Sequence, residues 1–401
     1  MIKCKTLYIN YILYYNIIIQ SEGFSVRQNA SPSQGALPVK SRIYRYLYSS
    51  KSFCSRQTIA ANCEISMPTL YQNLAQLMDE GLVRSSGEDR STGGRRAQGL
   101  DIIPDIRLAV GVAVTEQNLR LVLADLRLNE LAYRTVPFDP SNRSSDNGPA
   151  LSGILESFLE DYRVDRSKLL GVGIAVPALI SKNRERIDFA PTLGMKNTSL
   201  AFLTKDIPYP VHVENDGTAS GYAEGFLHNV DGNLAYFSLE NGVGGAVLID
   251  GVPYIGDNGH TGEFGHLCVE PGGLLCSCGK SGCLEAYCSA RRIETNLGVS
   301  PDEFFARAGL HNPEYEILLY DMLRHLAIAI NNVHMILDCD VVLGGFLSEY
   351  LPPYLPILKQ YVLAGNPFVK NADFVRLSTL RRHITPLGAA LFFVQEFVNS
   401  I

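Results

Sequence analysis

Three cysteines and a carboxylate lie within ten residues of this sequence, in the stretch "CSCGKSGCLE" at 276–285. His266 precedes the first of these cysteines by ten residues. Together with Cys276, Cys278 and Cys283, His266 offers one imidazole and three thiolates, which is the ligand set of a closed tetrahedral zinc site. These four side chains are therefore predicted to bind a metal ion, and zinc is the ion that suits them.

Two other kinds of thiol chemistry compete with zinc. A disulfide would leave one of the three thiols unpaired and would give the histidine no role. A redox pair is more typically Cys-x-x-Cys after a strand, whereas the spacing here is Cys-x-Cys-x4-Cys. Gly279 and Gly282 permit the tight turns with which so short a loop can wrap one ion. The sequence favours zinc, and Cys268 and Cys288 are expected to be small buried side chains outside the ligand set.

Carboxylates accompany the predicted metal ligands. Glu263 lies three residues before His266, and Glu285 closes the cysteine-rich stretch, so that fixing the ligands also fixes two carboxylates. Upstream, Asn215 and Asp216 end a predicted strand. Carboxylates and amides accept paired hydrogen bonds from hydroxyl groups, which is the chemistry that a polyol needs. Asp216 taken alone fits the N-cap of the following helix equally well.

The bulk composition is that of an ordinary globular protein. The 401 residues are 46% hydrophobic and 19% charged, which allows two or three domains with real cores. Nine cysteines are too sparse for a secreted disulfide scaffold, and five of them fall between Cys268 and Cys288. We therefore expect a reduced, cytoplasmic protein.

Residues 1–35 form an N-terminal extension that we assign to no domain. Its apolar run, Leu7–Ile19, has 13 residues, whereas a membrane-spanning helix takes about 20. Fourteen of the first twenty residues are Ile, Tyr, Asn or Lys, types with AT-rich codons, which favours translated leader sequence over a native strand or helix. Export ranks last, because no clear small-residue cleavage site follows. No association with membranes is predicted.

The charge is distributed unevenly along the chain. Residues 36–99 hold nine Lys and Arg against five Asp and Glu, whereas residues 100–401 hold 23 against 35. A basic segment ahead of an acidic body indicates a small nucleic-acid-binding module joined to a domain that binds something else.

The pattern of residues 36–100 predicts a winged helix-turn-helix domain. Ile43, Tyr46 and Leu47 have helical spacing, and Ser55 and Ser66 are placed to cap two further helices. Inward leucines of the third helix recur at the spacing of a buried stripe: Leu70, Leu74 and Leu77. Polar, uncharged side chains on its other faces are predicted to contact base edges in a major groove: Thr69, Tyr71, Gln72, Asn73 and Gln76.

A hairpin is predicted after the third helix. Its tip, "TGGRR", places Arg95 and Arg96 after two glycines, where they suit contacts to phosphates or to a minor groove. The alternative is a small three-helix bundle that binds no DNA. The helical pattern, the basic charge and the arginine-tipped hairpin together favour operator DNA as a partner.

The rest of the chain alternates strands and helices in a way that repeats. The hairpin pattern at 108–126 and the glycine-punctuated hairpin pattern at 234–251 each stand ahead of further strands and helices. This repetition predicts two similar α/β lobes. We place the first at 103–225, completed by a C-terminal helix at 385–401, and the second at 226–384.

The stretch "GHTGEFGHLCVEPGGLLCSCGKSGCLEAYCS" resembles the signature of the ROK family of bacterial sugar kinases and sugar-responsive repressors. From about Val39 onward the chain resembles the repressor branch, helix-turn-helix included. The resemblance implies a two-lobed, actin-like (ribonuclease H-like) α/β sugar-kinase fold with a structural zinc that braces the sugar site. It also implies which residues line the sugar pocket: Asn215, Asp216, Glu263, His266 and Glu285.

Departures from the family pattern argue against kinase activity. The kinases carry Asp-x-Gly-Gly-Thr in their first hairpin, whereas Ala113 holds the Asp place here and Thr115, Glu116 and Gln117 hold the Gly-Gly-Thr places. Side chains there would block the approach of ATP phosphates to backbone N–H groups. The later glycine loop, "ENGVGG", is kept, but Glu240 and Asn241 stand where small or hydroxyl residues are usual. Pro177-Ala178 replaces the family's separate "PG" loop, which bears on part of the sugar contact. We therefore expect no catalytic residue and read Asp216 as the vestigial base.

These observations predict a sugar-responsive transcriptional regulator, most simply a repressor, that binds operator DNA as a homodimer or homotetramer. One alternative is a sugar kinase that kept a DNA-binding domain. Another is a repressor whose effector is a partner protein rather than a sugar.

Overall fold

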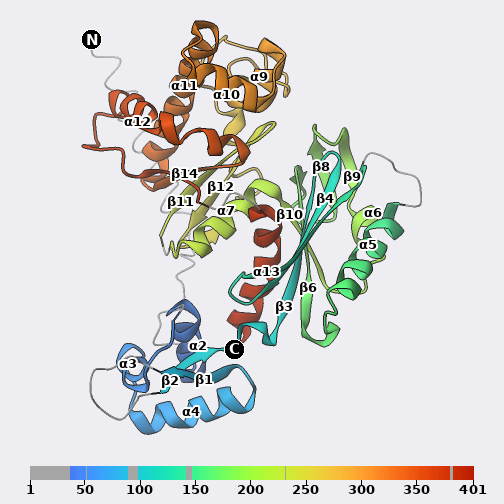
Figure 1. The fold of residues 1–401 in the computed structure, drawn as a ribbon, viewed down its shortest axis with the longest axis vertical. Helices are drawn as coiled ribbons and strands as arrows, with labels where there is room; N and C mark the ends of the chain where they lie inside the picture. The colour runs from blue at the N-terminus through green and yellow to red at the C-terminus, as the bar shows by residue number, and fades with distance from the viewer. Residues whose placement is uncertain (1–36, 51, 89–97, 141–146, 231, 380–382) are drawn as a thin grey trace, which may run out of the picture.

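The computed structural model describes six stretches of the chain: 37–50, 52–88, 98–140, 147–230, 232–379 and 383–401. The N-terminal extension and the predicted contacts of Arg95 and Arg96 lie outside the described residues. Figure 1 shows a small N-terminal head beside a two-lobed body, with the end of the last helix next to the head.

The head contains three helices followed by an antiparallel hairpin, in agreement with the predicted helix-turn-helix domain. The helices are α2 (Val39–Ser50), α3 (Arg56–Asn62) and α4 (Met67–Asp79), and the hairpin pairs β1 (Val83–Glu88) with β2 (Gln98–Ile102).

The sequence patterns that predict the head helices are confirmed in the structure. The Ser55 hydroxyl accepts a hydrogen bond from the Thr58 N–H at 3.1 Å, and the Ser66 hydroxyl accepts one from the Thr69 N–H at 3.3 Å. Both serines therefore cap the orphan N–H groups of a helix N-terminus. The predicted inward stripe of α4 is buried: Leu70, Leu74 and Leu77.

Helix α2 departs from the predicted pattern. The spacing predicts that Tyr46 faces inward, but Tyr44 and Tyr48 are buried and Tyr46 is only half-buried. The reason is tertiary. A second face of α2 packs on the body, where the Tyr48 ring lies 5.8 Å from the ring of Phe226.

The first lobe is built on a five-stranded sheet of order β10-β6-β3-β4-β5. Strands β3 to β5 form an antiparallel meander, and β6 and β10 extend it in parallel with β3. The strands are β3 (Leu108–Val114), β4 (Asn118–Asp125), β5 (Glu130–Pro137), β6 (Leu169–Val176) and β10 (Val211–Asn215).

The second lobe repeats this pattern in the order β13-β12-β11-β14-β15. An antiparallel meander is again extended by two parallel strands. The strands are β11 (Leu234–Leu239), β12 (Val243–Ile249), β13 (Val252–Pro253), β14 (Asp340–Gly344) and β15 (Val375–Leu377). The predicted similarity of the two lobes is therefore a repeat of sheet topology.

Two helices join the lobes. Helix α7 (Asp216–Leu227) follows the last strand of the first sheet but packs on β11 and β12, and α13 (Ile384–Ser400) follows the second sheet but packs on β3 and β6 (Figure 1). The remaining helices and a three-stranded outer sheet are α5 (Asn147–Asp161), α6 (Ala201–Thr204), α8 (Glu285–Cys288), α9 (Ala290–Leu297), α10 (Pro301–Gly309), α11 (Pro313–Leu337), α12 (Leu355–Ala364), β7 (Leu179–Ile180), β8 (Arg186–Ala190) and β9 (Met195–Ser199).

Helices α7 and α13 touch through their backbones. A Cβ added at Gly388 of α13 would lie 1.8 Å from the carbonyl oxygen of Ala219 in α7. On its other side, α13 approaches β3 so closely that a Cβ at Gly111 would lie 1.7 Å from the carbonyl oxygen of Pro386. There is no space for a larger residue at these two positions, and α13 is closely packed against β3 on one side and α7 on the other.

Within the described stretches, no helix has the length and apolar character needed to cross a membrane.

Substituting Gly388 by Ala should lower the free energy of unfolding by roughly 1–3 kcal/mol, because the new methyl group has no space between α13 and α7. Gly153 offers a matched control, since it also lies in a helix, α5, but a Cβ there meets nothing within 4 Å. Gly153→Ala should raise the free energy of unfolding by roughly 0.5–1 kcal/mol, the usual helix preference for alanine. Urea denaturation measures both, and equal stabilities of the two variants would contradict the packing argument.

Candidate functional site

The four predicted metal ligands come together. His266 ends a short 3-10 turn, η4 (Phe264–His266), and the three cysteines lie in the loop that leads into α8. The ligand atoms of His266, Cys276, Cys278 and Cys283 all lie within 4.8 Å of one another. Such a cluster of three thiols and one imidazole suits a closed tetrahedral ion.

The distances within the cluster fit zinc. The sulfurs of Cys278 and Cys283 are 3.7 Å apart, and Nδ1 of His266 is 3.7 Å from the sulfur of Cys276. A tetrahedron with metal–sulfur bonds of about 2.3 Å has edges of about 3.8 Å. The other ring nitrogen of His266, Nε2, faces a carboxylate oxygen of Glu263 at 3.9 Å, and such a carboxylate orients a ligating imidazole.

The predicted glycine turns shape this loop. Gly279 and Gly282 have φ values of 88° and 84°, in the left-handed region that glycine adopts without strain. A Cβ at Gly282 would also lie 1.9 Å from the carbonyl oxygen of Glu270, so that any larger residue there would push the loop open. Of the two cysteines predicted to lie outside the ligand set as buried side chains, Cys288 is buried and Cys268 is exposed.

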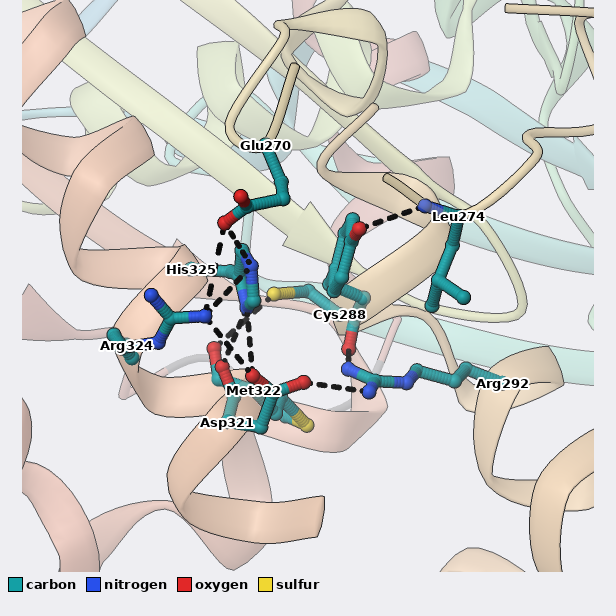
Figure 2. Close-up of polar contacts among 9 residues, drawn as sticks. Glu270, Leu274, Cys288, Arg292, Asp321, Met322, Arg324 and His325 are labelled. Atoms are coloured by element: carbon teal, nitrogen blue, oxygen red, sulfur yellow. Dashed lines mark hydrogen bonds and ion pairs between the residues drawn. The ribbon is translucent and has the colours of Figure 1, made fainter. Parts of the chain in front are cut away.

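The loop is also tied to the second lobe by a polar network around His325, a buried residue of α11 (Figure 2). The ring of His325 stacks on Tyr287 at 3.8 Å, and its Nε2 faces a carboxylate oxygen of Glu270 at 3.5 Å. The Tyr287 hydroxyl in turn accepts a hydrogen bond from the Leu274 N–H at 2.7 Å. The segment that carries the three cysteines, which we call the metal loop, is therefore anchored to helix α11 at both of its ends, through Glu270 and Tyr287.

Asn215 and Asp216 lie at the junction of β10 and α7. Asn215 is the N-cap: its side-chain oxygen accepts from the Thr218 N–H at 3.0 Å, and its side-chain amide donates to the Ala178 carbonyl at 3.1 Å. The N-cap role that the sequence allows for Asp216 is therefore filled by Asn215. Asp216 is the first helical residue, and its carboxylate accepts from the Gly217 N–H at 2.9 Å.

We call the region where Asp216 of α7 meets Glu263 and Glu285 of the second lobe the cleft, and the carboxylates in it influence one another. Burial raises the pKa of Asp216 to about 6. Burial also raises the pKa of Glu263 to about 7, and the charges of Asp216 and Glu285 add to the rise. Near neutral pH the group holds both protonated and ionised carboxyls, which donate as well as accept hydrogen bonds.

Glu285 connects the metal loop to the glycine loop of the second lobe. One of its carboxylate oxygens accepts from the Ser277 hydroxyl at 2.8 Å, and the other accepts from the Val243 N–H at 3.1 Å. A Cβ at Gly242 would lie 2.7 Å from that second oxygen. The position of this carboxylate is therefore set by both loops.

A recess of about 430 Å³, open to solvent, lies beside these carboxylates. Of the five predicted sugar-pocket residues, Asn215 and Glu263 line it, whereas Asp216, His266 and Glu285 do not.

The recess also contains residues that the sequence did not single out: Lys182, Arg184 and Glu214. Arg184 contacts the buried carboxylate of Glu214 at 2.6 Å. Burial would raise the pKa of Glu214, but hydrogen bonds from His212 and Arg184 hold it below its usual value. The polar run "SKNRER" after the β7 pattern signals the turn that carries the two cations, but only the fold brings that turn against β10.

Side chains occupy the β3–β4 turn at the places where the resemblance to sugar kinases predicts the glycines of a phosphate-binding loop. The Thr115 N–H and hydroxyl both donate to the Asn118 carbonyl, at 2.9 and 3.0 Å, which tightens the β3–β4 turn. Glu116, at the tip of that turn, faces Arg291 of the second lobe at 3.8 Å.

Helix α4 presents part of its predicted contact set to solvent. Tyr71, Gln72 and Gln76 are exposed. The Thr69 hydroxyl instead lies 2.8 Å from that of Ser66, and the side-chain amide of Asn73 donates to the Thr69 carbonyl at 2.8 Å. Three of the five predicted side chains are therefore exposed, with the guanidinium of Arg56 over the ring of Tyr71 at 5.8 Å, and the other two are held against the helix.

Comparisons with known proteins agree with this architecture. The xylose repressor of Bacillus spizizenii is 27% identical over 365 residues, which span 86% of this chain and 92% of that protein. The DNA-binding transcriptional dual regulator NagC of Escherichia coli (strain K12) is 28% identical over 249 residues, or 61% of this chain and 60% of NagC.

Solved structures share the fold. A ROK family transcriptional regulator, described as a homologue of the Escherichia coli MLC protein, superposes with a TM-score of 0.70 at 22% identity, over 90% of this chain and 96% of its own. The ROK hexokinase of Thermus thermophilus superposes with a TM-score of 0.61 at 26% identity, over 73% of this chain and 100% of its own. The predicted two-lobed sugar-kinase fold is thereby confirmed. The family model for ROK proteins matches residues 109–396, and the chain belongs to the ROK family.

Proposed function

We propose that the protein is a sugar-responsive transcriptional repressor whose N-terminal winged helix-turn-helix binds operator DNA. The observation that carries this proposal is that one chain joins a helix with exposed polar side chains, α4, to a ROK body in which the carboxylates of Asp216, Glu263 and Glu285 lie close enough for their charges to interact. The names of its relatives, xylose repressor and NagC, a DNA-binding transcriptional regulator, point the same way.

The metal cluster is proposed to hold one structural zinc through Nδ1 of His266 and the thiolates of Cys276, Cys278 and Cys283. Bound zinc supplies cross-linking rather than chemistry, since four protein ligands leave no open position. The chain's own part is to orient carboxylates: the His266 ring faces Glu263, and the loop that carries the cysteines holds Glu285 through Ser277.

The sugar is proposed to bind in the cleft beside Asn215, Asp216, Glu263, His266 and Glu285, with the recess next to Asn215 and Glu263 as its entrance. The mixture of ionised and protonated carboxyls favours a neutral polyol, whose hydroxyl groups both donate and accept. D-xylose and N-acetylglucosamine are the first sugars to try, because the xylose repressor of Bacillus spizizenii and an N-acetylglucosamine repressor of Escherichia coli are relatives of this chain.

On DNA, α4 is proposed to enter the major groove with Thr69, Tyr71, Gln72, Asn73 and Gln76, while Arg95 and Arg96 contact phosphates or the minor groove. Two heads on a self-paired operator require a homodimer or a homotetramer. The absence of a disulfide framework in the sequence favours the cytoplasm.

A sugar kinase is the second candidate, because Asp216 has the position and the raised pKa of a general base. Ala113, in place of a carboxylate, and Glu116, which would repel phosphates, weigh against it. We therefore propose that kinase activity has been lost.

Purified protein should contain about one zinc ion per chain, and Cys278→Ser should lose the zinc and much of the thermal stability, because binding energy at a structural site is folding energy. Cys268→Ser is the matched control, since Cys268 is an exposed thiol close in sequence to the ligands but outside the set. Elemental analysis and thermal melts measure both effects. Metal-free wild type with the melting temperature of zinc-loaded protein would overturn the assignment.

Gln72→Ala should change which duplexes the protein selects from a random library, by about 1–3 kcal/mol for each lost base contact. Replacing Arg95 and Arg96 by Ala should instead weaken binding to all sequences and flatten its salt dependence, because phosphate contacts release counterions. Fluorescence anisotropy at several salt concentrations distinguishes the two results. A reversed outcome, with the arginine pair setting sequence choice, would place the wrong element in the groove.

Sugar should change affinity for the selected duplex by about 5–150-fold, and the duplex should change sugar affinity by the same factor. Asp216→Asn should weaken sugar binding and leave DNA affinity without sugar unchanged. Asp188→Asn, in β8 and paired with Arg186 away from the recess, should behave as wild type. Calorimetry with D-xylose and N-acetylglucosamine, with and without duplex, tests this.

If neither sugar alters DNA affinity in this experiment, the proposed sugar response is wrong for both. Consumption of ATP by wild type in the presence of either sugar, abolished in Asp216→Asn, would support the kinase instead.

A further inference from the structure

The head does not hang free of the body. Its buried side chains and those of the body form one continuous apolar cluster, in which Ile43 and Leu47 of α2 belong with Leu126, Leu128 and the C-terminal half of α13. A head attached only by a linker would have a core of its own. The docked position of the head is therefore part of the fold, and a change in the body has a direct route to it.

An ion pair marks one side of this interface. Arg127, in the turn between β4 and β5, contacts the carboxylate of Asp101 in β2 of the head, and both side chains are largely buried, at 13% and 14% exposure. The same guanidinium lies 3.4 Å from the Leu47 carbonyl of α2. The buried carboxylate of Asp125 fixes the turn by accepting hydrogen bonds from the N–H groups of Arg127 and Asn129 at 2.8 and 3.0 Å.

The other side is formed by Tyr48 of α2. Its ring packs against Phe226, near the end of α7, and its hydroxyl accepts a hydrogen bond from Gln395 of α13 at 3.2 Å. The Ser41 hydroxyl donates to the Ile401 carbonyl at 2.6 Å, at the end of α13. Both helices that join the lobes therefore end on the head.

The opposite ends of these two helices lie at the cleft. Helix α7 begins at Asp216, and the Ser220 hydroxyl donates to the Asp216 carbonyl at 2.7 Å and contacts the Thr385 hydroxyl, at the start of α13, at 2.9 Å. From Asp216 to Phe226 is about 15 Å along a helix. Since the backbones of α7 and α13 touch at Gly388, displacement of one carries the other with it.

We infer that the interface made by Arg127 with Asp101 and by Tyr48 with Phe226 and Gln395 is the element through which the sugar site controls DNA binding. This inference rests on the proposed function and names its route of regulation. Packed interfaces switch between discrete arrangements rather than deform continuously, so that a sugar that favours one setting of α7 changes the docking of the head.

Arg127→Ala tests the route without altering the cleft or the proposed DNA-contacting residues. The factor by which D-xylose or N-acetylglucosamine changes affinity for the selected duplex should fall toward one, while sugar affinity without DNA stays within about twofold of wild type. Arg134→Ala is the matched control, because Arg134 pairs with Asp161 within the first lobe and its other side-chain contacts among the described residues are to the same helix, α5, and the residue that follows it. It should keep the wild-type factor.

A second variant guards against local misfolding in the first. Gln395→Ala removes the hydrogen bond to Tyr48 and should reduce in part the factor by which sugar changes DNA affinity. The chain contains no tryptophan, so Tyr48→Trp supplies a single tryptophan at the interface, which can be excited at wavelengths that tyrosine does not absorb. Its emission should shift with sugar in the otherwise wild-type protein and stay fixed in the Arg127→Ala background.

Two failures are distinguishable. If wild type binds a sugar but its affinity for DNA does not change, the proposed function is wrong, and so is this inference. If wild type responds to sugar and both Arg127→Ala and Gln395→Ala respond equally well, the proposed function stands and this interface is not the route.

Discussion

The contact on which the rest of the structure depends is the meeting of two helix backbones, α7 and α13, at Ala219 and Gly388. Because α13 is pressed equally closely against β3 at Gly111, the first sheet, α13, α7 and the second sheet form one stack with no compressible layer. The cleft carboxylate Asp216 begins one of these helices, and the head rests on the ends of both. The close packing of α7 and α13 therefore fixes both the position of Asp216 and the surface on which the head rests.

The residues of the cleft come from two parts of the structure, the region of the metal cluster and the start of helix α7. Four potential metal ligands come together within 18 residues of sequence, and a bound ion, as proposed, would fix the loop whose Ser277 holds Glu285 and the imidazole that faces Glu263. Asp216 and Asn215 come from the other lobe, on the N-terminus of α7. The site therefore exists only where both lobes are in place, as expected for a site whose occupancy reports on lobe geometry.

Local features were predicted from the sequence and distant ones were not. The leucine stripe of α4 and the serine caps follow from helical periodicity and capping chemistry, and the metal ligands follow from a short spacing. The burial of Tyr44 and Tyr48, the Arg127–Asp101 pair and the cations of the recess depend on segments between 26 and 347 residues apart, which no local pattern encodes. The spacing of the sequence picks out the carboxylates beside the metal ligands, but their grouping into one sugar pocket was predicted only through resemblance, since each alone looks like solvated surface.

The exchange of helices between the two sheets has a consequence for how the chain folds. One face of each sheet is covered by a helix that follows the sheet of the opposite lobe, α7 on the second sheet and α13 on the first. Each lobe has an apolar cluster of its own residues, but the layer that α7 and α13 form between the two sheets takes residues from both lobes. This middle layer, and with it the surface on which the head rests, can therefore be completed only when both lobes are present.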